Sequence, residues 1–158
     1  MNFSKFTIKA QEAVQAAIEL AQNHNHQAVE PVHLLKALIS DTDNVVVTIL
    51  NKLSVPLQPL NNDLDRAMKA LPVVKGSSVS GQYLSNATRE LFDRAQKQAT
   101  DLEDEYISSE HLLIATAGSA NEAGELLKGR QVTKEQILKV LKDVRGSQKV
   151  DDPNAESR

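Results

Sequence analysis

The 158-residue sequence predicts an all-α fold made of two tandem repeats of about four helices each. Apolar residues recur at helical spacing along most of the chain, which is typical of amphipathic helices. One short segment occurs twice, as VEPVHLLKA at 29–37 and ISSEHLLIA at 107–115. Only 3% of the residues are aromatic, so the core must consist mainly of aliphatic side chains. Together these observations favour duplicated helical units over a mixed or β fold.

The duplication extends over nearly the whole chain at an offset of 78 positions, which becomes 77 in the second half of each repeat. The aligned pairs include Phe6 with Leu84, Ala13 with Leu91, Ala17 with Ala95, His33 with His111, Leu50 with Leu127 and Leu64 with Leu141. We therefore predict one domain over residues 1–145, with repeat one at about 4–71 and repeat two at about 83–145. The connection at 72–82 and the polar stretch at 146–158 are predicted to be an inter-repeat loop and a flexible tail.

Helix starts in repeat one are marked by capping residues and prolines. Thr7 is suited to cap the first helix, and Pro31 to the first turn of the second. Pro56 or Pro59 is expected to open a fourth helix that runs to about Leu71.

The third helix of repeat one is predicted over NVVVTILNKL. Its valine run at 45–47 also fits a strand, but the copy in repeat two, NEAGELL, has no β-forming residues, so a helix is favoured. Repeat two should follow the same plan, with helices that start near Ser85, Ser108, Asn121 and Thr133.

Composition and charge exclude several classes of function. With 18 Lys and Arg against 21 Asp and Glu, the formal net charge is -3 and no basic cluster suggests nucleic-acid binding. The absence of cysteine excludes disulfides, cysteine zinc sites and thiol nucleophiles. No apolar run resembles a signal peptide or a membrane span, so we expect a cytoplasmic protein that does not contact membranes.

Glu110 and His111 are the first candidate for chemistry, because a carboxylate beside an imidazole can act as a general base or bind a metal. Repeat one keeps the histidine as His33 but has Val32 before it, so the pair is not duplicated. We therefore predict that His111 packs or hydrogen-bonds locally. Glu110 is favoured in a first helical turn and is expected to stay available for a partner.

Two other motifs are weaker. His24 and His26 could bind a metal, but they lack a third ligand nearby and are interpreted as solvated or as cations at a helix end. Gly76 and Gly81 have the spacing of a phosphate loop, but Gln82–Tyr83 stands where Lys and Ser or Thr are required. We therefore predict no cofactor, no metal and no enzymatic activity for this chain.

The acidic run DLEDE at 101–105 precedes the second copy of the repeated segment. Asp104 and Glu110 are expected to edge one acidic surface beside apolar helix ends, which would suit unfolded segments rich in hydrophobic and basic residues. An ordinary solvated loop is the alternative.

The segments KFTIKAQEAVQAAIELA, VEPVHLLKAL, DEYISSEHLLIA and RGSQKVDDPNAE make the sequence resemble the duplicated N-terminal domain of the Clp ATPases, and within that family the ClpB-type disaggregases. The resemblance implies a pseudo-twofold, non-enzymatic domain. Such a domain binds unfolded or aggregated polypeptides and passes them to a hexameric ATP-driven motor formed by other parts of the parent chain. The isolated domain is expected to be a monomer.

The resemblance also implies where substrate binds. Polar contacts are assigned to Thr7, Asp104 and Glu110, and an apolar groove between the first helices of the two repeats is assigned to Phe92, Leu91 and Ala13. Arg94, Gln98 and His111 should make this groove narrower or more polar. The alternatives are an N domain that docks an adaptor of a protease-linked unfoldase, and a small hydrolase or metal-binding protein.

Overall fold

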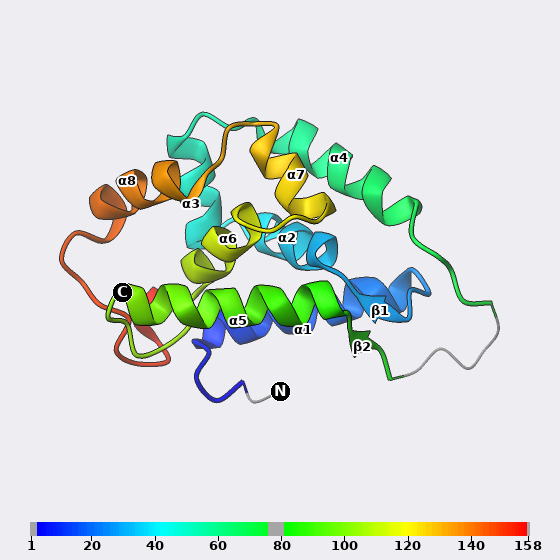
Figure 1. Cartoon of the computed structure of the whole chain (residues 1–158), viewed down its shortest axis with the longest axis horizontal. Coiled ribbons are helices and arrows are strands. Elements are labelled where there is room, and N and C mark those ends of the chain that lie inside the picture. Colours follow the sequence, from blue (N-terminus) through cyan, green and yellow to red (C-terminus); the bar gives the residue numbers. More distant parts are fainter. Residues whose placement is uncertain (1–2, 76–80, 158) are drawn as a thin grey trace.

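The computed structural model describes residues 3–75 and 81–157, and these residues form eight α-helices with two very short strands (Figure 1). Repeat one contains α1 (Ile8–Asn23), β1 (Ala28–Val29), α2 (Pro31–Ser40), α3 (Val45–Lys52) and α4 (Leu57–Lys69). Repeat two contains β2 (Tyr83–Leu84), α5 (Asn86–Asp101), α6 (Ser109–Ala117), α7 (Glu122–Lys128) and α8 (Lys134–Arg145), followed by a 3-10 turn η1 (Ala155–Ser157). The predicted all-α fold is confirmed, and the valine run belongs to helix α3.

The capping residues act as the sequence predicts. The Thr7 hydroxyl accepts a hydrogen bond from the Ala10 amide at 3.1 Å, and the Ser85 hydroxyl accepts one from the Thr88 amide at 3.1 Å. Each bond satisfies a backbone donor that has no partner within its own helix. Pro31 is the first residue of α2, where its missing N–H costs no helical hydrogen bond.

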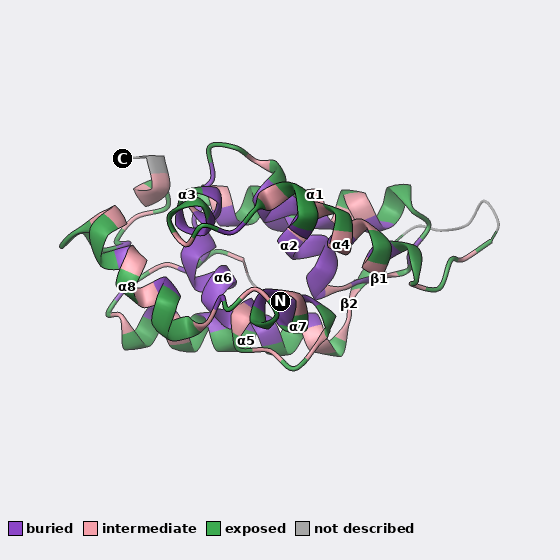
Figure 2. Cartoon of the chain, turned by 90° about the horizontal axis from the view of Figure 1, so that it is seen from above, coloured by how far each residue is buried: buried purple, intermediate pink, exposed green. Residues whose placement is uncertain are grey.

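The helices form layers (Figure 1), with α1 and α5 on one side, α2 and α6 in the middle and the remaining helices on the other side. Nearly every residue of α2 and α6 is buried, so these two helices form the centre of the core (Figure 2). None of the helices in the described ranges has both the length and the apolar character needed to cross a bilayer.

The two repeats exchange backbone hydrogen bonds at two equivalent places. β1 pairs with β2 in parallel, with Val29 opposite Leu84, and an isolated parallel bridge joins Phe6 to Ile107. The offset of 78 relates these two pairings to each other. In both, the residue before the N-cap of the first helix of one repeat is tied to the residue before the N-cap of the second helix of the other, so the repeats interlock.

Gly124 provides a test of packing between α6 and α7. A Cβ atom at this position would lie 2.0 Å from the Ser119 carbonyl oxygen and 2.9 Å from the Thr116 carbonyl oxygen, so the backbone would have to shift. Gly124→Ala should lower the free energy of unfolding by about 1–3 kcal/mol, measured by urea denaturation. In the control Gly118→Ala, the new atom would meet its nearest neighbours at 3.7 and 3.9 Å, so stability should change little. Equal stability of the two variants would contradict this packing.

Candidate functional site

A buried carboxylate organises the end of the molecule where α6 begins and α8 ends. Asp104 lies in the loop between α5 and α6 and accepts three hydrogen bonds. They come from His111 Nε2 at 2.8 Å, the Arg145 guanidinium at 2.5 Å and the Val150 amide at 3.0 Å. Burial alone would raise the pKa of Asp104, but these three donors outweigh it and lower the pKa to about 2. Asp104 is therefore ionised at neutral pH.

His111 and His33 hold equivalent structural positions in the two repeats. His111 Nδ1 accepts a hydrogen bond from the Ser108 amide at 2.8 Å, which leaves Nε2 to carry the proton and donate to Asp104. His33 Nδ1 likewise accepts from the Glu30 amide at 2.9 Å. The prediction that His111 hydrogen-bonds locally is confirmed.

His26 is buried, which corrects its interpretation as a solvated residue or a cation at a helix end. His26 Nδ1 lies 2.9 Å from His33 Nε2 and takes the place that Asp104 has in repeat two. Burial and the neighbouring His26 lower the pKa of His33 to about 4, so the pair is neutral at neutral pH.

Glu110 is also buried, with 4% of its surface exposed. Its Oε2 lies 3.6 Å from Arg145 Nη1, and its Oε1 accepts no hydrogen bond from any described residue. The predicted acidic surface formed by Asp104 and Glu110 is therefore wrong, because Arg145 lies between the two carboxylates and both are enclosed. We refer to Thr7, Asp104, Glu110, His111 and Arg145 as the polar cluster.

The last residues of the chain cover this cluster, although the sequence predicted a flexible tail from residue 146. After α8, Gly146 adopts a φ of +59°, a conformation that L side chains rarely take, and the chain turns back. Residues 147–157, here named the C-terminal segment, then follow the domain surface. The Val150 carbonyl accepts a hydrogen bond from the Glu105 amide at 2.8 Å, and the Pro153 carbonyl accepts one from the Ile8 amide at 2.8 Å.

Glu156 makes the central contact of the C-terminal segment. One carboxylate oxygen accepts from the Thr7 hydroxyl at 2.5 Å, and the other accepts from the Ser109 amide at 2.6 Å. Ser109 is the first residue of α6, whose positive dipole end favours an anion. Burial, with the nearby charge of Glu110, raises the pKa of Glu156 despite these bonds.

The structure brings the predicted polar residues together but buries the predicted apolar ones. Leu91, Phe92 and Ala13 are 0%, 2% and 6% exposed and belong to the core. Phe3 and Phe6 contact Phe92 edge to face, with ring centroids 5.9 and 5.5 Å away. In this structure Leu91, Phe92 and Ala13 therefore present almost no apolar surface to solvent, and the rings of Phe3 and Phe6 pack on Phe92.

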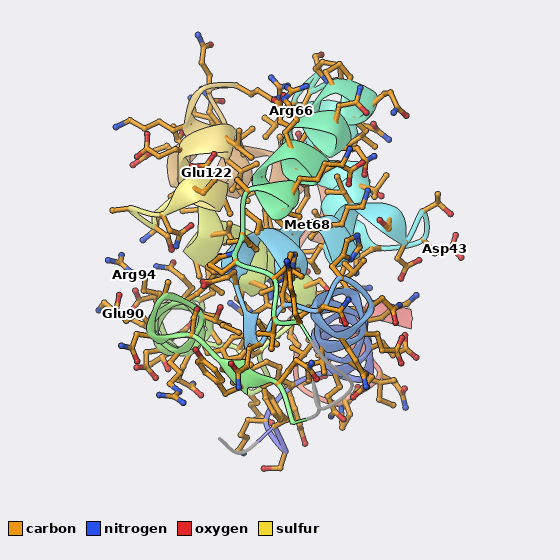
Figure 3. The ribbon with its side chains drawn as sticks, turned by 90° about the vertical axis from the view of Figure 1, so that its right-hand side faces the viewer. Asp43, Arg66, Met68, Glu90, Arg94 and Glu122 are labelled. Atoms are coloured by element: carbon orange, nitrogen blue, oxygen red, sulfur yellow. The ribbon has the colours of Figure 1, made fainter. Side chains whose placement is uncertain are left out.

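The three polar residues that were predicted to make this groove narrower or more polar lie in different environments. Arg94 lies with Glu90 on the outer face of α5 (Figure 3) and is exposed. Gln98 is half-buried on the same helix, and His111 belongs to the polar cluster.

An apolar cavity of about 410 Å³ lies next to the polar cluster, and the sequence interpretation did not find it. Its walls are formed by Leu102, Leu138, Leu141, Lys142, Arg145 and residues 146–149. Arg145 was also missed as a site residue, although it opens the RGSQKVDDPNAE segment. The offset of 78 could have indicated the role of Asp104, because it aligns Asp104 with His26.

The hydrolase and metal alternatives find little geometric support in the described residues. Both ring nitrogens of His111 are engaged, and neither contacts Glu110. No group of three or more His, Asp or Glu side chains in the described ranges is arranged to hold a metal ion. Most of the GSSVSG stretch, residues 76–80, lies outside the described residues.

Comparison with known proteins gives consistent results. The family model for the Clp repeat N-terminal domain matches residues 5–130. The chaperone protein ClpB of Bacillus cereus is 37% identical over 159 residues, and that of Vibrio cholerae is 37% identical over 156 residues. In both cases the match covers 99% of this chain and 18% of the relative, so the chain spans about a fifth of the length of these relatives.

Two solved structures show the same fold. The Hsp104 N-terminal domain from Candida albicans matches with a TM-score of 0.83 and 20% identity, over 97% of this chain and 99% of that one. A ClpV N-domain in complex with a VipB peptide matches with a TM-score of 0.70 and 17% identity, over 89% and 86% of the two chains.

Replacing Asp104 tests the energetic importance of the polar cluster. Asp104→Asn removes the charge that three donors share and leaves the half-buried Arg145 paired with Glu110 alone among the described carboxylates. We expect a loss of about 3 kcal/mol in the free energy of unfolding. The control Asp101→Asn removes an exposed carboxylate that lies 4.0 Å from Lys97, and should cost less than about 0.5 kcal/mol. Similar losses in the two variants would show that burial of Asp104 has no special energetic role.

The histidine pair predicts a pH dependence of stability. Between pH 6.5 and about 4 the unfolded chain binds a proton at His33 that the folded chain excludes. The free energy of unfolding should therefore fall as the pH drops through this window, by up to about 3 kcal/mol. Urea denaturation at several pH values would measure the slope.

The control for this dependence is His33→Gln, which should remove the His33 contribution to the slope. Asp104 titrates below this window, and the raised pKa of Glu156 gives a slope of opposite sign in both proteins. Equal slopes for the two proteins would rule out His33 as the source.

Proposed function

The chain belongs to the Clp repeat N-terminal domain family, and on this premise we propose that it is the substrate-recognition domain of a ClpB-type disaggregase. In this proposal it transiently binds exposed segments of unfolded or aggregated proteins. It then passes them to an ATP-driven hexameric motor formed by the rest of the parent protein. The domain itself contributes binding and no chemistry.

The observation that carries the proposal is the apolar cavity beside the polar cluster. Leu102, Leu138 and Leu141 offer aliphatic surface, whereas Lys142, Arg145 and Lys149 place cationic groups around it. A cavity of about 410 Å³ is in the range of small-ligand sites and can admit apolar side chains of an extended chain. Arg145 is paired with Asp104 and Glu110, and Lys149 lies 3.9 Å from Glu103, so the exposed Lys142 is the cation best placed to meet an acidic residue that flanks the apolar ones of a client. This differs from the basic clients that an acidic surface would have favoured.

The size of the cavity favours weak binding. Only a few apolar side chains of a client can be buried there, while association costs several kcal/mol in lost freedom of motion. A dissociation constant in the micromolar range or weaker is therefore expected for one domain. Weak single contacts suit transfer to a motor, and several domains on one hexamer would add avidity.

A second candidate function is docking of one specific partner. The ClpV N-domain of similar fold was solved in complex with a VipB peptide, so this architecture can hold a defined segment. Such a domain would bind one sequence tightly and would not distinguish folded from unfolded proteins in general.

Backbone amide NMR during titration with reduced, carboxymethylated α-lactalbumin, which stays unfolded, tests the proposal. Amide shifts at Leu138, Leu141 and Arg145 should move with the unfolded protein and not with native α-lactalbumin. Leu138→Ser should weaken binding about tenfold, because it places a polar group in the apolar cavity.

The matched control is Leu20→Ser, which alters a separate cavity of about 360 Å³ between α1 and α2 and should leave the affinity unchanged. The absence of any shift with the unfolded protein at high micromolar concentration would sink the recognition proposal. It would leave docking of a specific partner as the alternative.

A further inference from the structure

We propose that the C-terminal segment is an internal ligand of the polar cluster, which a captured polypeptide must displace. The proposal rests on the proposed function, because residues 147–149 of the C-terminal segment form part of the wall of the apolar cavity and Arg145 belongs to both the cavity and the polar cluster. It adds that substrate capture and the position of the chain after α8 are coupled.

The C-terminal segment binds to the domain as a ligand would. The Glu156 carboxylate is held at both oxygens, by the Thr7 hydroxyl at 2.5 Å and the Ser109 amide at 2.6 Å. Val150 is buried, and its amide donates to Asp104 at 3.0 Å. Two residues assigned to substrate contacts by the family resemblance, Thr7 and Asp104, are thus directly occupied by the chain itself.

The sequence builds this site at only one of the two pseudo-equivalent ends. The offset of 78 places Pro31 where Ser109 stands and Val32 where Glu110 stands. Proline has no N–H to offer a carboxylate. The anion-binding position therefore depends on a difference between the repeats and is not a by-product of the repeated fold.

The docked state of the C-terminal segment is poised to open. Glu156 is half-buried and lies close enough to Glu110 for the two carboxylates to repel each other, and Glu110 Oε1 accepts no hydrogen bond from the described residues. A cavity of about 100 Å³ remains between the C-terminal segment and the domain, lined by Val45, Glu110, Val144 and Arg145 among others. Among the residues of the C-terminal segment whose burial is described, Val150 is the only buried aliphatic side chain. Polar contacts with imperfect packing hold the segment, so a competing chain can replace it.

A displaceable internal ligand lowers the apparent affinity for an external one by the fraction of molecules in which the site is open. If the segment is docked in most molecules, releasing it should strengthen client binding about five- to tenfold. Glu156→Ala removes both anchoring hydrogen bonds while leaving Thr7 free to cap α1.

The test uses the whole chain and reduced, carboxymethylated α-lactalbumin as the unfolded probe. In the free proteins, the Ser109, Ile8 and Val150 amide signals should differ between wild type and Glu156→Ala, because these amides report docking. Saturating wild type with the probe should move the same three signals towards their positions in the variant. The variant should bind the probe about five- to tenfold more tightly. Glu90→Ala, which removes an exposed carboxylate from the outer face of α5 (Figure 3), should match wild type in affinity.

The outcomes separate the two proposals. If the probe binds wild type but leaves the Ser109, Ile8 and Val150 signals in place, the internal-ligand proposal is overturned and the recognition proposal stands. Equal affinity of wild type and Glu156→Ala would overturn it as well. If the probe binds no form of the chain, the recognition proposal fails first. Because the wild-type signals suffice for this decision, the test holds even where Glu156→Ala lowers stability.

Discussion

The negative charge of Asp104 is the constraint on which this end of the molecule depends. A carboxylate removed from water must be satisfied by donors, and here the donors come from three separate parts of the chain. His111 supplies one from α6, Arg145 one from the end of α8, and Val150 one from the C-terminal segment. A single ionised group thus holds together the start of α6, the end of α8 and the chain that follows it.

A comparison of equivalent positions in the two repeats explains why a duplicated fold has two chemically different ends. Where repeat two has Asp104 and Arg145, the offsets of 78 and 77 place His26 and the buried Met68 in repeat one. One neutral imidazole, His26, and the thioether of Met68 replace the ion pair, while the histidine at His33 and His111 is kept in both repeats. The duplication therefore supplied the scaffold, and a few substitutions made one end charged and the other neutral.

The fold was largely predictable because helix periodicity, capping residues and the internal repeat are local signals. Thr7, Ser85 and Pro31 marked helix starts correctly for the reasons that make them favourable there. The environment of the site was not predictable, since Asp104 and Arg145 are 41 positions apart in sequence and no pattern links them. The contacts of the C-terminal segment were not predictable for a related reason. Its polar composition is typical of a flexible tail, but polar groups are also what it uses to bind the domain.

The exchanged pairings of Phe6 with Ile107 and of Val29 with Leu84 have a consequence for the history of this architecture. In each pairing, one residue comes from repeat one and the other from repeat two. One repeat alone therefore cannot complete either pairing. Two identical halves could complete both at once, as a symmetric homodimer. The present chain has the form expected when two such subunits are fused into one gene product, after which each half was free to diverge.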